Sequence, residues 1–162
     1  MKLLRNLNFA LIAIAIIQVL YYYPKLPDIV ASHFDGAGVA DGWSSRQAFF
    51  ALYLGILLLV VGVFLLLPQL YTAREGFSMN IPNRDYWLAP ERHQQTRDFF
   101  CRQMALMGVA HLAIAMLAIQ MAIAANLKAE VRLGDGLYWA LGAYAVFLIA
   151  WLFHFYRYFR RP

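Results

Sequence analysis

Four long apolar segments constrain this chain more than any other feature of its sequence. They cover about residues 7–23, 47–67, 104–125 and 137–155, and each is close to the roughly 20 apolar residues that a helix needs to cross a bilayer. The chain is 62 % hydrophobic and 14 % charged, whereas soluble domains are about 45–50 % apolar and about 25 % charged. The sequence therefore predicts an all-α integral membrane protein with four transmembrane helices, in a single domain covering residues 1–162.

The basic residues predict the orientation of these helices, because cytoplasmic loops collect Lys and Arg. With both termini inside, ten basic residues lie on the cytoplasmic side: Lys2, Arg5, Arg74, Arg84, Arg92, Arg97, Arg102, Arg157, Arg160 and Arg161. Only Lys25, Arg46, Lys128 and Arg132 lie outside. We therefore expect N-in/C-in topology, an outer Gly/Asp/His loop and a longer cytoplasmic loop. Because the basic residues sit at the ends of apolar runs and form no patch, no nucleic-acid partner is expected.

The first apolar run resembles a secretory signal, since Lys2 and Arg5 precede it. However, it ends in three tyrosines followed by Pro24, with no small-residue cleavage site. We expect it to remain as an uncleaved first span.

The outer loop concentrates polar side chains and glycines between the first two spans. Its candidate binding residues are His33, Asp35, Asp41 and Trp43. The imidazole and carboxylates could ligate an ion such as zinc or contact a partner, although their spacing matches no known metal motif. Alternatively, Gly36, Gly38 and Gly42 permit a tight turn, with the two aspartates bonding to the loop's own backbone amides. The sequence does not decide whether this loop binds a metal ion.

Within the spans, His111 and Gln18 are the candidate functional residues, because polar groups are costly in hydrocarbon. His111 shares a stripe of small residues with Gly108 and Ala115, so it should face another helix. Its simplest role is one hydrogen bond to that helix, and the alternative is a proton or substrate site. Gln18 and Gln120 lie near span ends and can meet water there. In the second span, Gly55 and Gly62 suggest a similar close-packed face.

The longer loop, about residues 72–102, contains Asn83, Arg84, Glu91 and Arg92 as candidate functional residues. Pro90 and Glu91 predict a helix start, and nothing interrupts the pattern until Asn126. The arginines and Glu91 can tie the loop to itself and to lipid phosphates. The chain has no Ser–His–Asp order, glycine-rich phosphate loop or His-x-x-x-His pair, so an enzyme is less favoured than a binding protein, and no cofactor is expected.

Two segments of the chain form a pattern: Pro27, His33-Phe34, Gly38 and Asp41-Gly42-Trp43 with a following basic residue, and the segment from Asn83 to Pro90-Glu91-Arg92. This pattern resembles that of a family of small bacterial membrane domains of unknown function. The same domain also forms the first part of the immunity proteins that protect bacilli from the sporulation-delaying peptide toxin. The chain departs from that pattern at Ala31, Asp35 and Arg46, and has fewer spans than the immunity proteins. The resemblance implies a multi-pass protein of the bacterial cytoplasmic (inner) membrane.

Three functions remain open on the sequence alone. The leading hypothesis is a non-enzymatic membrane protein that binds a peptide, a membrane-protein partner or another copy of itself, with a role in toxin immunity or signalling. The second is a small transporter or an accessory subunit of a membrane complex, using His111. The third is a metal-dependent membrane enzyme built on the outer loop.

Overall fold

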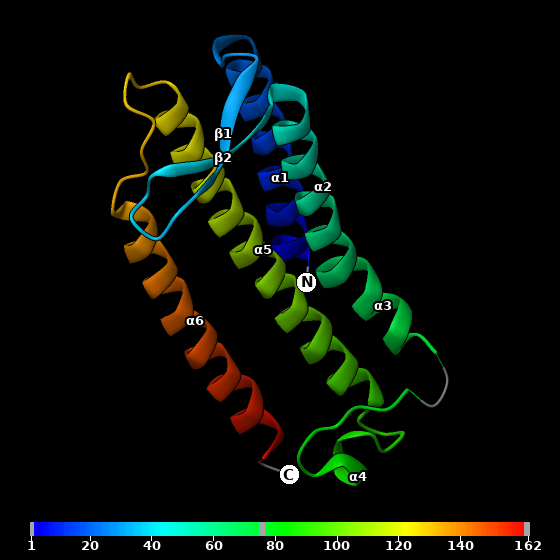
Figure 1. Ribbon diagram of the computed structural model, residues 1–162. Coiled ribbons are helices and arrows are strands. Elements are labelled where there is room, and N and C mark those ends of the chain that lie inside the picture. The colour runs from blue at the N-terminus through cyan, green and yellow to red at the C-terminus, as the bar shows by residue number, and fades with distance from the viewer. Residues whose placement is uncertain (1, 75–76, 161–162) are drawn as a thin grey trace.

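A computed structural model describes residues 2–74 and 77–160 of the chain, so Arg161 from the charge count lies outside the described residues. Four long helical stretches dominate it (Figure 1). They are α1 (Lys2–Tyr22) with the short η1 (Tyr23–Lys25), α2 (Arg46–Val61) continued by η2 (Gly62–Leu66) and α3 (Leu67–Thr72), α5 (His93–Asn126), and α6 (Gly136–Phe159). A short helix, α4 (Arg84–Trp87), lies in the long loop. Each of the four stretches is long and apolar enough to cross a membrane.

The fold is mostly helical, as expected, but it is not all-α, because the loop after α1 forms a β-hairpin. Strand β1 (Ile29–Phe34) pairs with β2 (Ala40–Ser45) in antiparallel fashion. The strands give the backbone groups of this segment partners that a short irregular loop could not supply. Asp35 and Gly38 form the turn, and Gly38 has a φ of 76°, a conformation that favours glycine.

The helix boundaries agree with the sequence in part. α5 is one continuous helix of 34 residues that ends at Asn126, as predicted, although it begins at His93 rather than at Pro90 or Glu91. Ser45 caps α2 by accepting a hydrogen bond from the Ala48 amide at 3.2 Å. Pro68 does not end its helix. It lies in the first turn of α3, directly after the π-helical turn of η2, which is a known way to absorb a local break in the hydrogen-bond ladder.

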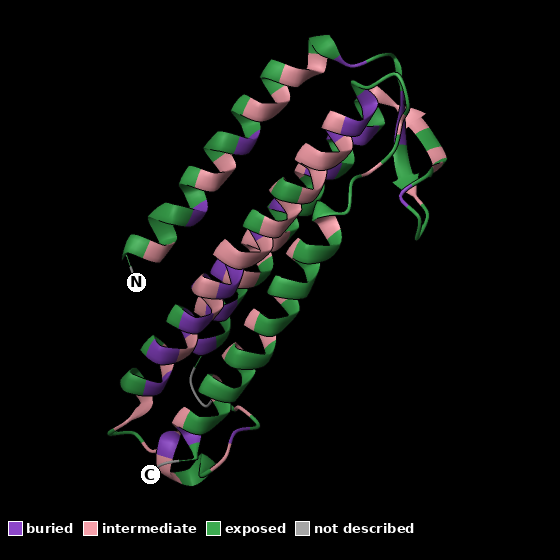
Figure 2. Ribbon diagram, turned by 90° about the vertical axis from the view of Figure 1, so that its left-hand side faces the viewer, coloured by how far each residue is buried: buried purple, intermediate pink, exposed green. Residues whose placement is uncertain are grey.

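α5 is the central helix, in contact with α1, α2, α3, η2 and α6. Its buried core with α1 and α2 includes Ala15, Phe50, Leu57, Leu112 and Ile123. Figure 2 shows the buried positions as narrow stripes, while the outward faces of the helices remain exposed. Such apolar outward faces are the surfaces that a bilayer would cover. On α6 only Phe159 is buried.

Gly108 of α5 faces α1 closely, which confirms that this part of the small-residue stripe lies at a helix seam. A Cβ at Gly108 would lie 2.5 Å from the Asn8 Oδ1 atom. The Asn8 side chain is buried, and its Nδ2 atom donates to the carbonyl of Ala105 at 2.9 Å. The corresponding expectation for the second span was wrong. A Cβ at Gly55 or Gly62 would meet nothing within 4 Å, so these glycines are not at a close seam.

Candidate binding site beneath the hairpin

The turn of the hairpin is built by Asp35. Its Oδ1 atom accepts hydrogen bonds from the amides of Ala37 and Val39, both at 2.8 Å. A Cβ at Gly38 would lie 2.8 Å from the carbonyl oxygen of Leu133, so glycine is required there by space as well as by φ. Asp35 was considered either as a ligand or as a residue that shapes the turn, and its hydrogen bonds are those of a turn-forming residue.

His33 and Asp41 face one another across the two strands. The imidazole Nδ1 lies 2.5 Å from the Asp41 Oδ1 atom, and the side chains are 73 % and 47 % exposed. Because a carboxylate only accepts hydrogen bonds, Nδ1 carries the hydrogen and Nε2 is left for another contact. Gly42 makes this arrangement possible, since a Cβ there would lie 2.8 Å from the Cβ of His33. The His, Asp and Gly of the loop therefore form one unit.

Asn126, the last residue of α5, fastens β1 to the helix bundle. Its Oδ1 atom accepts from the amide of Ala31 at 2.7 Å, and its Nδ2 atom donates to the carbonyl of Ala31 at 2.9 Å. The same Nδ2 donates to the carbonyl of Ala122. The side chain thus pairs with the edge of β1 as another strand would. From the sequence, Asn126 was expected only to end the helix. A polar side chain at the end of a long apolar helix could, however, have pointed to a contact there.

The hairpin is also held at its tip and at its base. At the tip, the Leu133 amide donates to the carbonyl of Gly38, and the Tyr138 hydroxyl donates to the carbonyl of Gly36, both at 2.9 Å. At the base, Arg46 pairs with Asp28 at 2.9 Å. These contacts position the hairpin over the space between α2 and the start of α6. Trp43 is exposed on β2.

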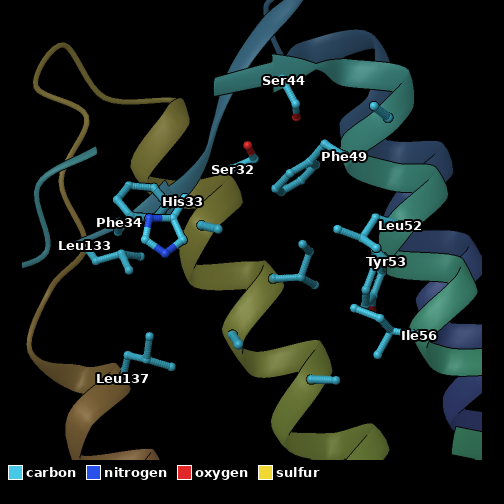
Figure 3. Close-up of a pocket in the computed structure, with 15 residues that line it drawn as sticks. Ser32, His33, Phe34, Ser44, Phe49, Leu52, Tyr53, Ile56, Leu133 and Leu137 are labelled. Carbon is cyan, nitrogen blue, oxygen red and sulfur yellow. The ribbon is translucent and has the colours of Figure 1, made fainter. Parts of the chain in front are cut away.

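An apolar groove of about 670 Å³ lies beneath the hairpin. Its floor is the alanine face of α5, and α2 forms one wall (Figure 3). The hairpin supplies the only polar lining besides the tyrosine hydroxyl: Ser32, Ser44 and His33. The complete lining is Ser32, His33, Phe34, Ser44, Ala48, Phe49, Leu52, Tyr53, Ile56, Ala115, Ala118, Ile119, Ala122, Leu133 and Leu137. The groove is therefore apolar along its length and polar at one end.

Gln18 belongs to a hydrogen-bond network between helices, which the sequence did not predict. Its Nε2 atom donates to Gln120 Oε1 at 2.8 Å, and its Oε1 atom accepts from the Tyr53 hydroxyl at 2.8 Å. Gln120 in turn donates to the hydroxyl of Tyr22. The network joins α1, α2 and α5 behind the groove wall. It satisfies groups that would be costly to leave unpaired in a membrane.

His111 lies between α5 and α6, which confirms that it faces another helix. Its Nδ1 atom is 2.8 Å from the carbonyl of Met107, and its Nε2 atom is 2.8 Å from the Tyr144 hydroxyl. Since a carbonyl only accepts, Nδ1 carries the hydrogen and Nε2 accepts from Tyr144. The Phe64 ring packs against the imidazole at a centroid distance of 4.5 Å. Both ring nitrogens are thus engaged within the bundle.

Asn83 and the neighbouring Trp87 cap the end of α6, far from the hairpin (Figure 1). The Asn83 amide donates to the carbonyls of Phe159 and Arg160 at 3.1 Å, and Trp87 Nε1 donates to the carbonyl of Phe159 at 2.9 Å. Asn83 has a φ of 51°, which asparagine tolerates better than most residues. These bonds give the last carbonyls of α6 partners.

The other candidates in this loop are separate from the groove. Arg92 lies over the Tyr86 ring at 3.9 Å, so it ties the loop to itself. Arg84 and Glu91 are exposed, and neither takes part in an ion pair within the described residues.

Within residues 2–74 and 77–160, no group of three or more His, Cys, Asp or Glu side chains is placed to hold a metal ion. His33 and Asp41 together offer two ligand groups, whereas protein zinc sites use three or four.

Comparison with known proteins bears on one part of the chain. No curated protein and no solved structure matches it. Residues 10–59 match a family model described as a domain of unknown function (DUF1648). The matched segment contains most of α1, the whole hairpin and most of α2. The part of the chain that carries His33, Asp41 and one wall of the groove is therefore similar to a domain of unknown function.

Proposed function

We propose that this chain is a non-enzymatic membrane protein that binds a transmembrane helix of a partner, either a protein or a membrane-active peptide, in the groove beneath the hairpin. The observation that carries the proposal is the groove itself, which is apolar along α2 and α5 and polar where the hairpin covers it. An apolar helix with a polar end has the matching pattern.

The floor of the groove suits a helix in particular. Ala115, Ala118 and Ala122 lie at steps of three and four along α5 and line the groove. In lipid, small residues at such spacing let a second helix approach closely, and packing rather than hydrophobicity drives the association. Leu52 and Ile56 of α2 add larger side chains on one wall.

The size of the groove indicates how deeply a helix would enter. A helix about 10 Å across that follows α2 from residue 48 to 56 is about 12 Å long and occupies roughly 900 Å³. The groove holds about 670 Å³. The groove is therefore smaller than this helix segment, so part of the partner helix would remain outside it.

The hairpin would determine which end of the partner helix lies beneath it. Nε2 of His33 remains available beyond the bond to Asp41, and Ser32 and Ser44 present hydroxyl groups at the same end of the groove. Polar groups in such a place fix register and orientation more than affinity. A partner with a hydrogen-bonding residue near this end fits best.

For location, we propose the bacterial inner membrane with both termini in the cytoplasm and the hairpin outside. The distribution of basic residues supports this orientation. A partner arriving from outside the cell would then meet the hairpin first. The resemblance of the hairpin residues to those of toxin-immunity proteins supports a peptide toxin as one such partner.

The other two hypotheses find less support. A transport role for His111 needs a ring nitrogen open to a proton or substrate, and both nitrogens are hydrogen-bonded inside the bundle. A metal enzyme on the hairpin needs more ligands than the His33–Asp41 pair offers.

Site-specific photocrosslinking in native membranes tests the proposal. Leu52→p-benzoylphenylalanine places the probe in the groove, and Leu58→p-benzoylphenylalanine places it on the exposed side of the same helix. We expect a discrete peptide or protein adduct from position 52 and only lipid adducts from position 58.

A second substitution makes this result specific to the groove. Ala118→Leu fills the floor, whereas Ala113→Leu adds the same volume at an exposed position of α5 outside the lining. The adduct should disappear in the first variant and persist in the second, with both variants keeping the parent melting temperature. Lipid adducts alone at position 52, or an adduct that survives Ala118→Leu, would show that no helix binds there.

A further inference from the structure

We propose a second binding site, independent of the groove, for the phosphate group of an anionic phospholipid at the end of the bundle opposite the hairpin. The site is a cavity of about 280 Å³ where α1, the η2–α3 segment and α5 meet. Its lining is Lys2, Arg5, Leu65, Gln69, Cys101 and Ala105.

Two cations define the chemistry of this cavity. Lys2 and Arg5 are three residues apart on α1, so they project from the same face of the helix. The described residues form two ion pairs, His33–Asp41 and Arg46–Asp28, and neither involves these cations. Among residues 2–74 and 77–160, no carboxylate lines the cavity. Within this described part of the chain, an anion would therefore find two positive side chains that no acid already neutralises.

The two cations match a phosphate in complementary ways. The guanidinium of Arg5 can bind two phosphate oxygens at once, while Lys2 acts as a mobile point charge. Gln69 adds a donor, because its Nε2 atom uses one hydrogen toward the carbonyl of Leu65 at 2.9 Å and an amide nitrogen carries two.

The surroundings indicate a lipid rather than free phosphate. Leu65 and Ala105 contribute apolar walls, and the neighbouring surface of α1 and η2 is apolar and open, with Leu3 72 % and Leu66 56 % exposed. A phosphate in the cavity could thus keep its acyl chains along these helices. Basic pockets between transmembrane helices on the cytoplasmic side are suited to anionic head groups, and the proposed topology puts the cavity on that side.

Native mass spectrometry of the purified full chain tests this site, using phosphatidylglycerol and phosphatidylcholine with identical acyl chains. We expect one phosphatidylglycerol to be retained preferentially. Lys2→Gln with Arg5→Gln should weaken that binding by about 25-fold, which is roughly fivefold for each basic residue. Arg5→Lys should retain most of it. Arg157→Gln with Arg160→Gln removes the same charge near the same end of the bundle, on α6, and should leave the retained lipid unchanged.

Three results would overturn the proposal. Equal retention of the two lipids would show no charge recognition. Equal weakening by both double variants would show general surface attraction. Displacement of phosphatidylglycerol by millimolar inorganic phosphate would show an anion site with no preference for a lipid. Melting temperatures of the double variants in detergent, which should match the parent, exclude loss of fold as the cause.

Discussion

Gly42 and His33 face each other across the hairpin. Because Gly42 has no side chain, the His33 side chain can lie over it. The backbone partner of His33 in the strand register is Gly42. Without a Cβ at Gly42, the imidazole can lie over β2 and meet Asp41. The Asp41-Gly42 pair lies within β2 and is therefore explained by packing across the strands, whereas Asp35 and Gly38 form the turn.

At this scale we predict that Gly42→Ala displaces His33 from Asp41. The added Cβ would lie 2.8 Å from the Cβ of His33, and overpacking of this kind costs about 1–3 kcal/mol. The melting temperature should fall, and the His33 ring resonances should shift in NMR spectra of histidine-labelled protein. Gly36→Ala is the matched control, because a Cβ there meets nothing within 4 Å. Identical melting and identical His33 resonances in the two variants would show that the glycine does not hold the pair together.

Among the elements, α5 contacts each of the other long helices, and its last residue connects these helices to the hairpin. Asn126 is buried and satisfies both backbone groups of Ala31. A two-stranded hairpin alone is marginally stable in water. Its order here therefore depends on this attachment together with the contacts at its tip.

We predict that Asn126→Ala loosens the hairpin while leaving the helices in place. The amide and carbonyl of Ala31 would lose their partners, and a buried unsatisfied group costs about 1–3 kcal/mol. Hydrogen–deuterium exchange should rise in peptides covering residues 29–45 and remain unchanged in α6. Asn80→Ala, at an exposed position, is the control. Unchanged exchange in the hairpin would mean that the tip contacts alone hold it.

In the whole molecule, hydrogen bonds hold α6 against the other elements near its start, near its middle and at its end. Tyr138 bonds to the hairpin tip, Tyr144 to His111, and the carbonyl of Phe159 to Asn83 and Trp87. The last of these contacts lies at the opposite end of the helix from the first (Figure 1). This arrangement keeps α6 beside α5 without closing the groove toward α2.

The proposed topology is tested by cysteine labelling in intact cells, in a Cys101→Ser background. Glu130→Cys lies at the hairpin end and Asn80→Cys at the opposite end, and both positions are exposed. We expect an impermeant maleimide to label position 130 and to label position 80 only after the cells are opened. The reverse pattern would invert the molecule in the membrane and move the hairpin to the cytoplasm.

The four long helices could be predicted from local sequence, because apolar runs of this length have few other stable conformations. In hydrocarbon every backbone group must be paired within the structure, and a helix does so using neighbouring residues alone. For the same local reason the continuity of α5 to Asn126 could be predicted. The position of His111 between helices could be predicted from its polarity and from the small residues on its face of α5.

The tertiary structure alone decided the hairpin and what surrounds it. Gln18 bonds to Gln120, which is 102 residues away, and Ala31 bonds to Asn126, which is 95 residues away. Local periodicity carries no information about such partners, since they depend on how helices pack in three dimensions. The same holds for the groove, because its floor, wall and roof come from α5, α2 and the hairpin. Of the candidate residues named from the sequence, only His33 lines the groove, and residues such as Leu52 and Ala118 join it through packing alone.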